Sequence, residues 1–358
     1  MKSSIKIFSI FGIPVELHIS FLLLIILIFS MAFFGFISFY IAFLIILLFS
    51  TVIIHELSHS YMAKRYGIPV DRIILLPIGG IASMGKIPKD PNQELKIAIA
   101  GPSANIIIAL FCFICLGIIG GLGSLSFSSL FITNTPSADL TLFLSNFLGV
   151  NLLLGIFNLL PAFPMDGGRV LRAFLARKMD YVKATKIAAS VGIQFAVLIA
   201  ILGIFFNIFL ILIAIFIYIG ADQEYKATLI SSMLEGIYVK DIMAKNVDTL
   251  SPETPVFEAL STMFKQRHMG YPVMDNENLI GIVTFEDISK LPEERHTVPI
   301  KNIMTKNLIL ASPDEPALSA LEKIQKNNIG RLPVTRNGKL IGIVSKTDII
   351  RVLDSKSV

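Results

Sequence analysis

Two histidines and a glutamate stand together in a strongly hydrophobic part of this chain, in the sequence HELSH at residues 55–59. On a helix, His55 and His59 lie at positions i and i+4 of one face, where both imidazoles can ligate Zn²⁺. Glu56 beside them can then act as the general base in a metal-assisted hydrolysis. The preceding segment, Leu17–Ile54, contains no Asp, Glu, Lys or Arg. Because ionisable groups inside membrane segments are costly, this placement predicts a hydrolytic metal site embedded in lipid.

A catalytic zinc usually has three protein ligands and one open position. The candidate for the third ligand is Asp166, in the sequence NLLPAFPMDGGR at residues 158–169. The two prolines are expected to break a helix here, and the two glycines allow close approach of the backbone. An aspartate on such irregular backbone can point into a helix bundle. The alternative is an ordinary helix-end aspartate that pairs with Arg169.

Asn158 opens the same segment and has no polar neighbour in its apolar helix. We expect its amide to donate a hydrogen bond to the substrate carbonyl or to the oxyanion that develops there. The alternative is a structural hydrogen bond between two helices.

The positions that carry these motifs belong to a membrane domain. The chain is 54% hydrophobic and only 16% charged, against about 25% charged in an ordinary soluble domain. A transmembrane helix needs about 20 apolar residues, and this requirement predicts six such helices. The last tract is expected to form two short helices with a tight turn near residues 203–207. The tracts without acidic or basic residues are 17–54, 97–138, 141–165 and 187–221.

Charge asymmetry predicts the orientation of these helices. The loops at about 34–40, 121–139 and 203–207 contain no Lys or Arg, whereas the intervening loops are basic. By the positive-inside rule, both termini are expected in the cytoplasm of a multi-pass cell-membrane protein. The net charge of +5 does not indicate nucleic-acid binding, because the basic residues lie at the ends of apolar segments.

Residues 67–94 are not membrane-like. Two β-type runs flank a Pro-Ile-Gly-Gly turn at residues 77–80, which predicts a small β-hairpin at the surface or in a protein-lined cavity. Its edge near Gly79–Met84 could receive an unwound substrate strand by β-augmentation.

The last third of the chain carries an internal repeat. Val239–Ile288 aligns without gaps on Ile300–Ile349, at a constant offset of 61 residues. Each copy predicts a β-α-β-β-α unit, and two copies form one α/β domain. The predicted organisation is a six-helix membrane domain at 1–221, a linker at 222–238, a first unit at 239–295 and a second unit at 296–358.

Taken together, the HExxH motif and the distant NxxPxxPxDG motif resemble those of the site-two protease family of intramembrane zinc metalloproteases. The sequence AGPSAN at residues 100–105 matches the Gly-Pro element of the family's third helix. The resemblance covers about residues 5–220. It implies that His55, His59 and Asp166 ligate one Zn²⁺ per chain and that Glu56 is the general base.

The repeat resembles a tandem of cystathionine-β-synthase-type (CBS) modules, which often bind adenine nucleotides and can form homodimers. The family's ribose and phosphate element falls on Thr284 with Asp287 and on Ser345 with Asp348. The resemblance implies that ATP, ADP or AMP contacts these residues. The alternative is that both pairs are plain helix N-terminal residues.

These observations predict a six-helix membrane zinc protease with a cytoplasmic CBS pair. His55 and His59 lie nine and five residues before Lys64, or about 8–14 Å along a helix. Cleavage of another protein's transmembrane helix is therefore expected near the cytoplasmic leaflet. The rival is a CBS-regulated transporter or channel that uses the polar cluster as an ion site. That rival accounts for the tail but not for a hydrolase arrangement of two His, one Glu and one Asp.

Overall fold

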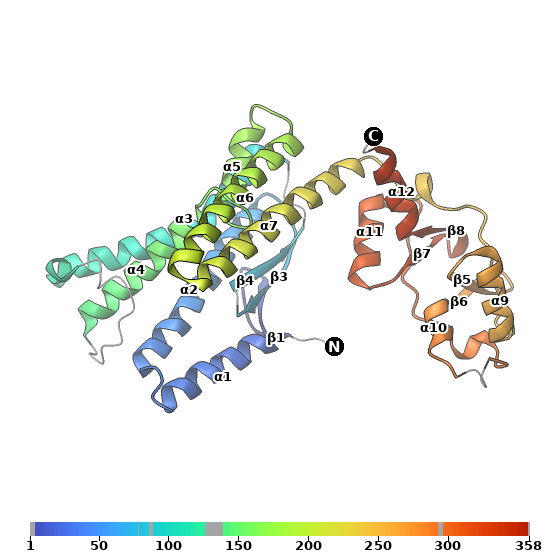
Figure 1. Cartoon of the computed structure of the whole chain (residues 1–358), viewed down its shortest axis with the longest axis horizontal. Coiled ribbons are helices and arrows are strands. Elements are labelled where there is room, and N and C mark those ends of the chain that lie inside the picture. Colours follow the sequence, from blue (N-terminus) through green and yellow to red (C-terminus); the bar gives the residue numbers. More distant parts are fainter. Residues whose placement is uncertain (1–3, 78, 86–88, 126–138, 293–295, 357–358) are drawn as a thin grey trace. The chain divides into compact units, whose positions relative to one another are not determined.

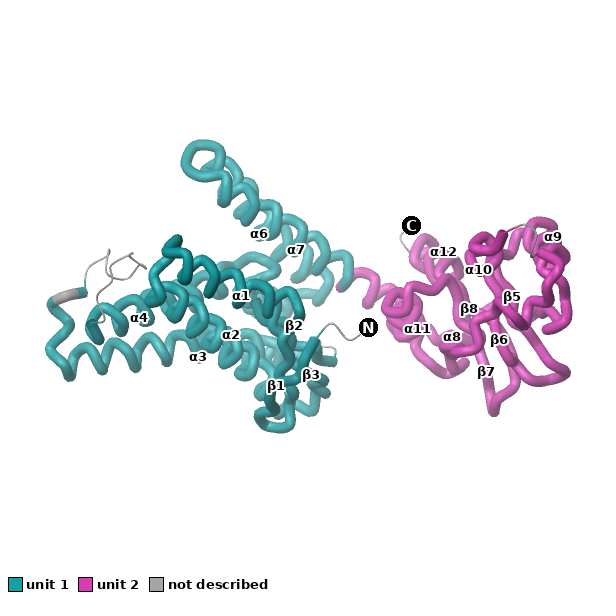
Figure 2. Tube along the Cα trace, turned by 90° about the horizontal axis from the view of Figure 1, so that it is seen from below, with its two compact units in different colours: residues 1–227 teal, residues 228–358 magenta. Residues whose placement is uncertain are grey.

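The computed structural model describes residues 4–77, 79–85, 89–125, 139–292 and 296–356. The chain divides into two compact units, residues 1–227 and residues 228–358 (Figure 2). Unit 1 combines long helices with one small sheet, and unit 2 is an α/β body (Figure 1). The HELSH sequence and Asp166 both lie in unit 1.

Five helices of the described chain are long and apolar enough to cross a membrane. A further apolar helix, α1 (Ile19–Phe33), has 15 residues, fewer than the ~20 that span a hydrocarbon core. Length and composition thus support five spans, and they do not establish the predicted count of six. The five long helices are α2 (Phe39–Arg65), α3 (Pro91–Ile118), α4 (Leu140–Asn158), α6 (Tyr181–Phe206) and α7 (Ile208–Met233).

The last two helices differ from the prediction of two short helices. Each has 26 residues, because polar residues continue them beyond the apolar tract. Asp180 begins α6 by accepting from the backbone N–H of Val182, and the break between α6 and α7 comes at Asn207, whose backbone is extended. The segment 222–238, expected to be a linker, is helical up to Met233 because α7 continues into it.

Four strands form a small mixed sheet in the order β1-β2-β3-β4. The predicted strands around the glycine turn are β3 (Val70–Leu76) and β4 (Gly79–Met84), an antiparallel pair. Ile78, within the predicted turn, lies outside the described residues. On the other side, β3 runs parallel to β2 (Ile13–His18). Among the described strands, β4 has a partner on one side only.

The N-terminal hairpin was not predicted from the sequence. β1 (Ser4–Ile10) pairs antiparallel with β2, and the turn between them is Phe11-Gly12. Both turn residues have positive φ, 53° and 74°, as two-residue hairpin turns require. The alternation of polar and apolar residues in Ser4–Ile10 was the available signal.

Helix α3 lies at the centre of unit 1, because it packs against α2, α4 and the short helix α5 (Asp166–Ala176). A loop of irregular backbone at residues 159–165 joins α4 to α5. Most of the predicted loop at 121–139 lies outside the described residues, which resume at 139. Helices α2, α3 and α5 therefore form the frame around the predicted metal ligands.

Unit 2 contains two copies of one arrangement, each with its own hydrophobic core. The predicted first strand of each copy is reduced to one parallel bridge, Leu250 with Val273 and Ala311 with Val334. A short helix, α8 (Val239–Ile242), opens the first copy, and a 3-10 turn (Ile300–Asn302) opens the second. The copies comprise α9 (Val256–Gln266), β5 (Gly270–Asp275), β6 (Asn278–Thr284) and α10 (Phe285–Ser289), then α11 (Ala317–Lys326), β7 (Arg331–Arg336), β8 (Lys339–Ser345) and α12 (Lys346–Lys356).

Candidate metal centre

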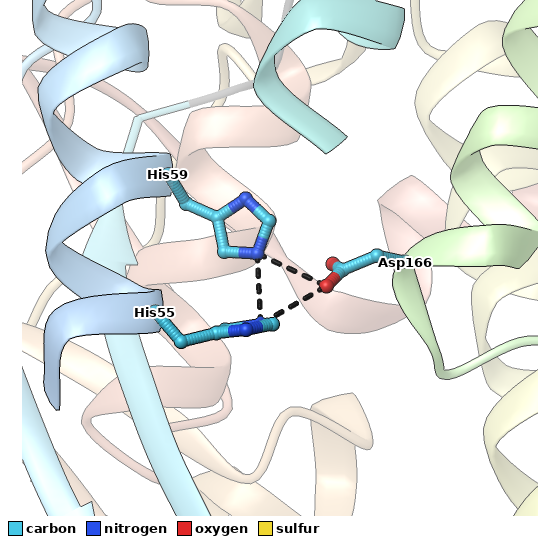
Figure 3. Close-up of side chains that lie close together, drawn as sticks. All are labelled: His55, His59 and Asp166. Atoms are coloured by element: carbon cyan, nitrogen blue, oxygen red, sulfur yellow. Dashed lines mark hydrogen bonds and ion pairs between the residues drawn. The ribbon is translucent and has the colours of Figure 1, made fainter. Parts of the chain in front are cut away.

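The three residues predicted as metal ligands converge from two helices (Figure 3). His55 and His59 lie one turn apart on α2, and Asp166 is the first residue of α5. The two Nε2 atoms are 3.1 Å apart, and they lie 3.1 Å and 3.0 Å from Oδ2 of Asp166. Three donor atoms thus form a nearly equilateral triangle, although 107 residues separate Asp166 from the nearer histidine.

This triangle fits a zinc ion. Zinc in proteins takes imidazole nitrogen and carboxylate oxygen at about 2.0–2.2 Å in tetrahedral geometry, so neighbouring ligand atoms lie about 3.3 Å apart. The observed separations of 3.0–3.1 Å are close to this value. Two histidines and one carboxylate are also a known ligand set of hydrolytic zinc sites, where a fourth position stays open.

A chain of buried amides, not predicted from the sequence, fixes the His55 ring. Asn151 donates from Nδ2 to the backbone carbonyl of Phe147 at 2.9 Å, so its Oδ1 faces Asn105. Asn105 donates to that oxygen at 3.2 Å and turns its own Oδ1 toward Nδ1 of His55, 2.6 Å away. The proton of His55 is thereby held on Nδ1, which leaves the lone pair of Nε2 for a metal.

A backbone carbonyl does the same for the second histidine. Nδ1 of His59 donates to the carbonyl oxygen of Ile97 at 2.6 Å, so its Nε2 also faces the triangle as an acceptor. Ile97, Gly101 and Asn105 lie four residues apart along α3, on one buried face of that helix. The small or polar residues Gly101, Asn105 and Ala109, spaced four apart after Ile97, were the signal in the sequence that could have identified this face.

Gly101 allows α3 to approach the two imidazoles. A Cβ atom at this position would overlap Nε2 of His59 and would lie 2.6 Å from Nε2 of His55. Gly80 on β4 similarly faces Glu56, where a Cβ would lie 2.5 Å from Cγ of the glutamate. The glycines therefore leave room for the metal ligands and bring the edge strand β4 next to the predicted base.

The loop before α5 places Asp166. Gly167 lies against the backbone carbonyls of Leu159 and Leu160, which folds the loop tightly under the helix. Burial acts to raise the pKa of Asp166, but its polar contacts with His55 and His59 outweigh burial and hold this pKa well below its ordinary value. A carboxylate in the first turn of a helix is also favoured by the helix dipole. The carboxylate points at the histidines, as Figure 3 shows, and not at Arg169, the predicted alternative partner.

Asn158 lies at the end of α4 and is half-buried. Its Nδ2 donates to the backbone carbonyl of Leu154 at 3.0 Å, a bond within its own helix. Among the described residues, the Asn158 side chain makes no hydrogen bond to any of His55, Glu56, His59 and Asp166. It also makes no hydrogen bond to another described helix, which was the predicted alternative. Its amide is nevertheless close in sequence to the loop that carries Asp166.

The residues predicted to contact a nucleotide form two capping boxes in unit 2. Thr284 and Asp287 exchange hydrogen bonds at the start of α10, and Ser345 and Asp348 do so at the start of α12. In each pair the hydroxyl also donates to Oδ2 of the aspartate. This geometry matches the predicted alternative, in which both pairs are plain helix N-terminal residues. The other carboxylate oxygen of each aspartate, Oδ1, takes no part in the capping box.

We expect Asn105→Ala to weaken zinc binding by about 10- to 100-fold, the usual effect of removing a group that orients a metal-ligating histidine. The His55 ring would lose its Nδ1 partner and turn more freely. Competition with a chromogenic chelator in detergent measures the affinity. Asn146→Ala, which removes another buried amide of unit 1, is the matched control and should bind zinc like the wild type. Equal affinities in all three proteins would contradict this role of Asn105.

Comparison with known proteins gives the family. The profile of peptidase family M50 matches residues 42–199. A zinc metalloprotease of Methanocaldococcus jannaschii is 42% identical over 354 residues, which cover 99% of this chain and 97% of that protein. The chain belongs to the site-2 protease family. It is therefore a zinc metalloprotease and a multi-pass membrane protein, as predicted, and the family favours this activity over the transporter alternative.

Solved structures include relatives of each part. A site-2 protease from Methanocaldococcus jannaschii is 44% identical, covers 62% of this chain and 95% of that one, and has a TM-score of 0.44. The CBS domain profile matches residues 239–294 and 300–355, so the tail is a CBS pair. A CBS domain pair of protein MJ0100, solved in complex with 5′-methylthioadenosine and S-adenosyl-L-methionine, is 34% identical, covers 33% of this chain and 97% of that one, and has a TM-score of 0.32.

Proposed function

We propose that this protease hydrolyses a peptide bond in a transmembrane helix of a substrate protein, with one Zn²⁺ per chain held by His55, His59 and Asp166. The observation that carries the proposal is the triangle of donor atoms beside Glu56, with edges of 3.0–3.1 Å. Two imidazoles oriented through Nδ1 and one carboxylate are a ligand set for zinc, and they leave Glu56 free for proton transfer.

The chain's own groups divide the work of hydrolysis. Zinc, when bound, supplies Lewis-acid polarisation and makes water a stronger nucleophile near neutral pH. Glu56 takes the proton of the attacking water and passes it to the amide nitrogen as the peptide bond breaks. Asn158 is proposed to donate to the substrate carbonyl, where negative charge develops. Nδ2 already donates one hydrogen to the carbonyl of Leu154, and its second hydrogen is the one available for the substrate.

Strand β4 is proposed to receive the substrate. A helical substrate hides its carbonyl groups in hydrogen bonds, so a stretch of it must unwind before attack. β4 has an unpaired edge among the described strands, and its Gly80 lies against Glu56. Addition of an extended segment to this edge would bring a scissile bond next to the base.

The site is proposed to open to the cytoplasm, with six spans and both termini on that side. Helix α1 is about 22 Å long at 1.5 Å per residue, shorter than the ~30 Å hydrocarbon core. The exposed side chains of Phe33, Phe34 and Phe36 extend its apolar surface beyond the helix end. The basic loops on the side of Lys64 then face the cytoplasm, in agreement with the positive-inside rule.

Metal analysis and cleavage together test the proposal. The protein purified in detergent should contain one zinc per chain and cut a model substrate with a single transmembrane helix. His55→Ala and His59→Ala should each lose both zinc and cleavage, because two remaining ligands hold the metal weakly. A protein that cuts the substrate equally well after complete removal of metal would refute the proposed centre.

We also propose that the CBS pair binds an adenine nucleotide and alters access of substrate. Asp287 and Asp348 each keep one carboxylate oxygen, Oδ1, outside the capping box, and such an oxygen can accept from ribose hydroxyls. In Asp348 this oxygen also pairs with Arg351 at 3.7 Å. Each box also marks a helix N-terminus, where backbone amides favour phosphate. Regulation further requires that the nucleotide bind two arrangements of the tail with different affinity.

Calorimetry of the full chain with ATP, ADP and AMP is expected to show binding by at least one of them below millimolar concentration. Asp287→Ala or Asp348→Ala should weaken it by about tenfold, the value of a hydrogen bond to a charged group. Each change also removes a helix cap, so thermal unfolding of the variants without nucleotide serves as the control. Without binding by any of the three, the tail would instead be a dimerisation or docking module.

A further inference from the structure

A buried ion pair joins α5, which carries Asp166, to α3, which carries the groups that orient the two histidines. Arg172 of α5 is only 2% exposed, and Glu94 of α3 is 1% exposed. The guanidinium donates from Nε to Oε1 of Glu94 at 2.8 Å. Neither residue is a metal ligand or a proton carrier in the mechanism above. Burying two charges is costly, so this pair calls for an explanation.

The ion pair lies close to the metal ligands along both helices. Glu94 precedes Ile97, whose carbonyl orients His59, by three residues, or about 4.5 Å along α3. Arg172 follows Asp166 by six residues, or about 9 Å along α5. The pair therefore fixes where α5, and with it the third metal ligand, lies against α3.

A second carboxylate reaches the same guanidinium from α7. Nη1 of Arg172 donates to Oε1 of Glu224 at 2.8 Å, and the side chain of Glu224 is 31% exposed. The guanidinium also lies over the rings of Phe163 and Tyr181, 5.0 Å from each centroid. Tyr181 of α6 donates in turn to Glu94 at 3.3 Å. Four helices thus meet at one side chain.

Helix α7 connects this cluster to the tail without a break. It begins at Ile208 and ends at Met233, so it crosses the boundary between units at residues 227 and 228. Ile230, six residues after Glu224, and Leu234 pack into the core of the second CBS copy. Lys356 of α12 also donates to the carbonyl of Met233 at 2.8 Å. The far end of α7 is therefore held by the tail.

We propose that Arg172 is a positioning residue for the zinc centre and that Glu224 makes this position depend on the tail. A shift or rotation of α7 would move Glu224 relative to Arg172 and change the restraint on α5. Asp166 would then approach the histidines more or less closely. This inference rests on the zinc centre proposed above, and it supplies a route by which the tail regulates that centre.

Glu224→Gln tests the ion pair with little risk to the fold. Arg172 keeps Glu94 as its counter-charge, and an amide in place of the Glu224 carboxylate still fits the partly exposed position. We expect zinc affinity to fall by about three- to tenfold, less than for a direct partner of a ligand. The visible absorption of bound Co²⁺, which reports ligand geometry, should shift as well. Chelator competition and Co²⁺ spectra of the full chain in detergent measure both effects.

Asp222→Asn is the matched control. It removes a carboxylate two residues away on α7, where Asp222 pairs with Lys226 on the surface and does not contact α5. Its affinity and Co²⁺ spectrum should be those of the wild type. An equal change in Asp222→Asn and Glu224→Gln would overturn the proposal, since the effect would then belong to the helix in general. Wild-type values in Glu224→Gln would overturn it too.

Arg172→Lys tests the positioning role of Arg172 directly. A lysine keeps the charge but cannot hold two carboxylates in the planar geometry of a guanidinium. Its affinity should fall further than that of Glu224→Gln, with the same direction of change in the Co²⁺ spectrum. Zinc affinity and spectrum like those of the wild type would remove Arg172 from any positioning role.

Leu234→Ala in both backgrounds tests the dependence on the tail. It loosens the packing of α7 in unit 2, so it should weaken zinc binding in the wild type and have a smaller effect in Glu224→Gln. Additive effects in this double-mutant cycle would overturn the coupling. The outcomes also separate the two proposals. A wild-type chain that binds no zinc would refute the proposed centre together with this inference, whereas a zinc-binding wild type with an unresponsive Glu224→Gln would refute the inference alone.

Discussion

Glu56→Gln is expected to keep its zinc and lose about two to four orders of magnitude in cleavage rate, the usual contribution of a general base. The three clustered donor groups belong to His55, His59 and Asp166, so the amide leaves the metal ligands intact. Glutamine has nearly the same shape as glutamate and still fits beside Gly80 of β4. It cannot accept the proton of the attacking water. Zinc content and single-turnover cleavage of a transmembrane substrate in detergent measure the two effects.

Glu16→Gln provides the same chemical change elsewhere in unit 1. Glu16 lies on β2, where it accepts from Ser4 and pairs with Arg72, and it contacts no metal ligand. Its cleavage rate should stay within a few-fold of the wild type. Normal cleavage by Glu56→Gln would remove Glu56 from the mechanism. Loss of zinc in that variant would instead make Glu56 part of the metal site.

The sequence was sufficient to predict the family and the residues that converge on the site. The HExxH spacing puts His55 and His59 on one helical face whatever the rest of the fold, because helix geometry is local. Asp166 could be added because prolines and glycines break the backbone around it. These local signals do not depend on which helices are neighbours.

Gly101 and Asn105 stand in the AGPSAN element that matches the family, but the roles of the residues that orient the site depend on neighbouring helices and could not be assigned from the sequence. Asn105 and Gly101 are ordinary occupants of an apolar helix until α3 is placed against α2. Arg172 lies in one of the basic segments that the positive-inside rule assigns to the cytoplasmic side, yet it is buried between Glu94 and Glu224. Its role follows from tertiary contacts between residues 78 and 52 positions apart. No local pattern reports such pairs.

The secondary-structure errors have the same origin. Hydropathy registers only the apolar part of a helix, so α6 and α7 were expected to be short although capping and polar residues extend both. The alternation in strand β1 is interrupted where its register shifts between Lys6 and Phe8, and its pairing with β2 depends on the turn at Phe11-Gly12. In unit 2, the strand expected before each helix forms a single bridge.

Gly101→Ala is expected to abolish zinc binding and cleavage while leaving the fold as stable as before. The added methyl would overlap Nε2 of His59 and crowd Nε2 of His55, the two atoms that the metal needs. Alanine is favoured over glycine in a helix interior by about 1 kcal/mol, so a loss of metal cannot be attributed to a weakened α3. Zinc content of the purified variant and its thermal unfolding measure the two effects.

Gly117→Ala is the matched control for Gly101→Ala. Gly117 lies on the same helix, and its nearest neighbour to an added Cβ is Cδ1 of Leu122 at 3.6 Å, an ordinary van der Waals distance. This variant should bind zinc and cut substrate like the wild type. If Gly101→Ala kept one zinc per chain, α3 would have to move away from α2 to make room. Such a movement would break the bonds of Asn105 and Ile97 to the two imidazoles, and the account of how this helix orients the centre would then be wrong.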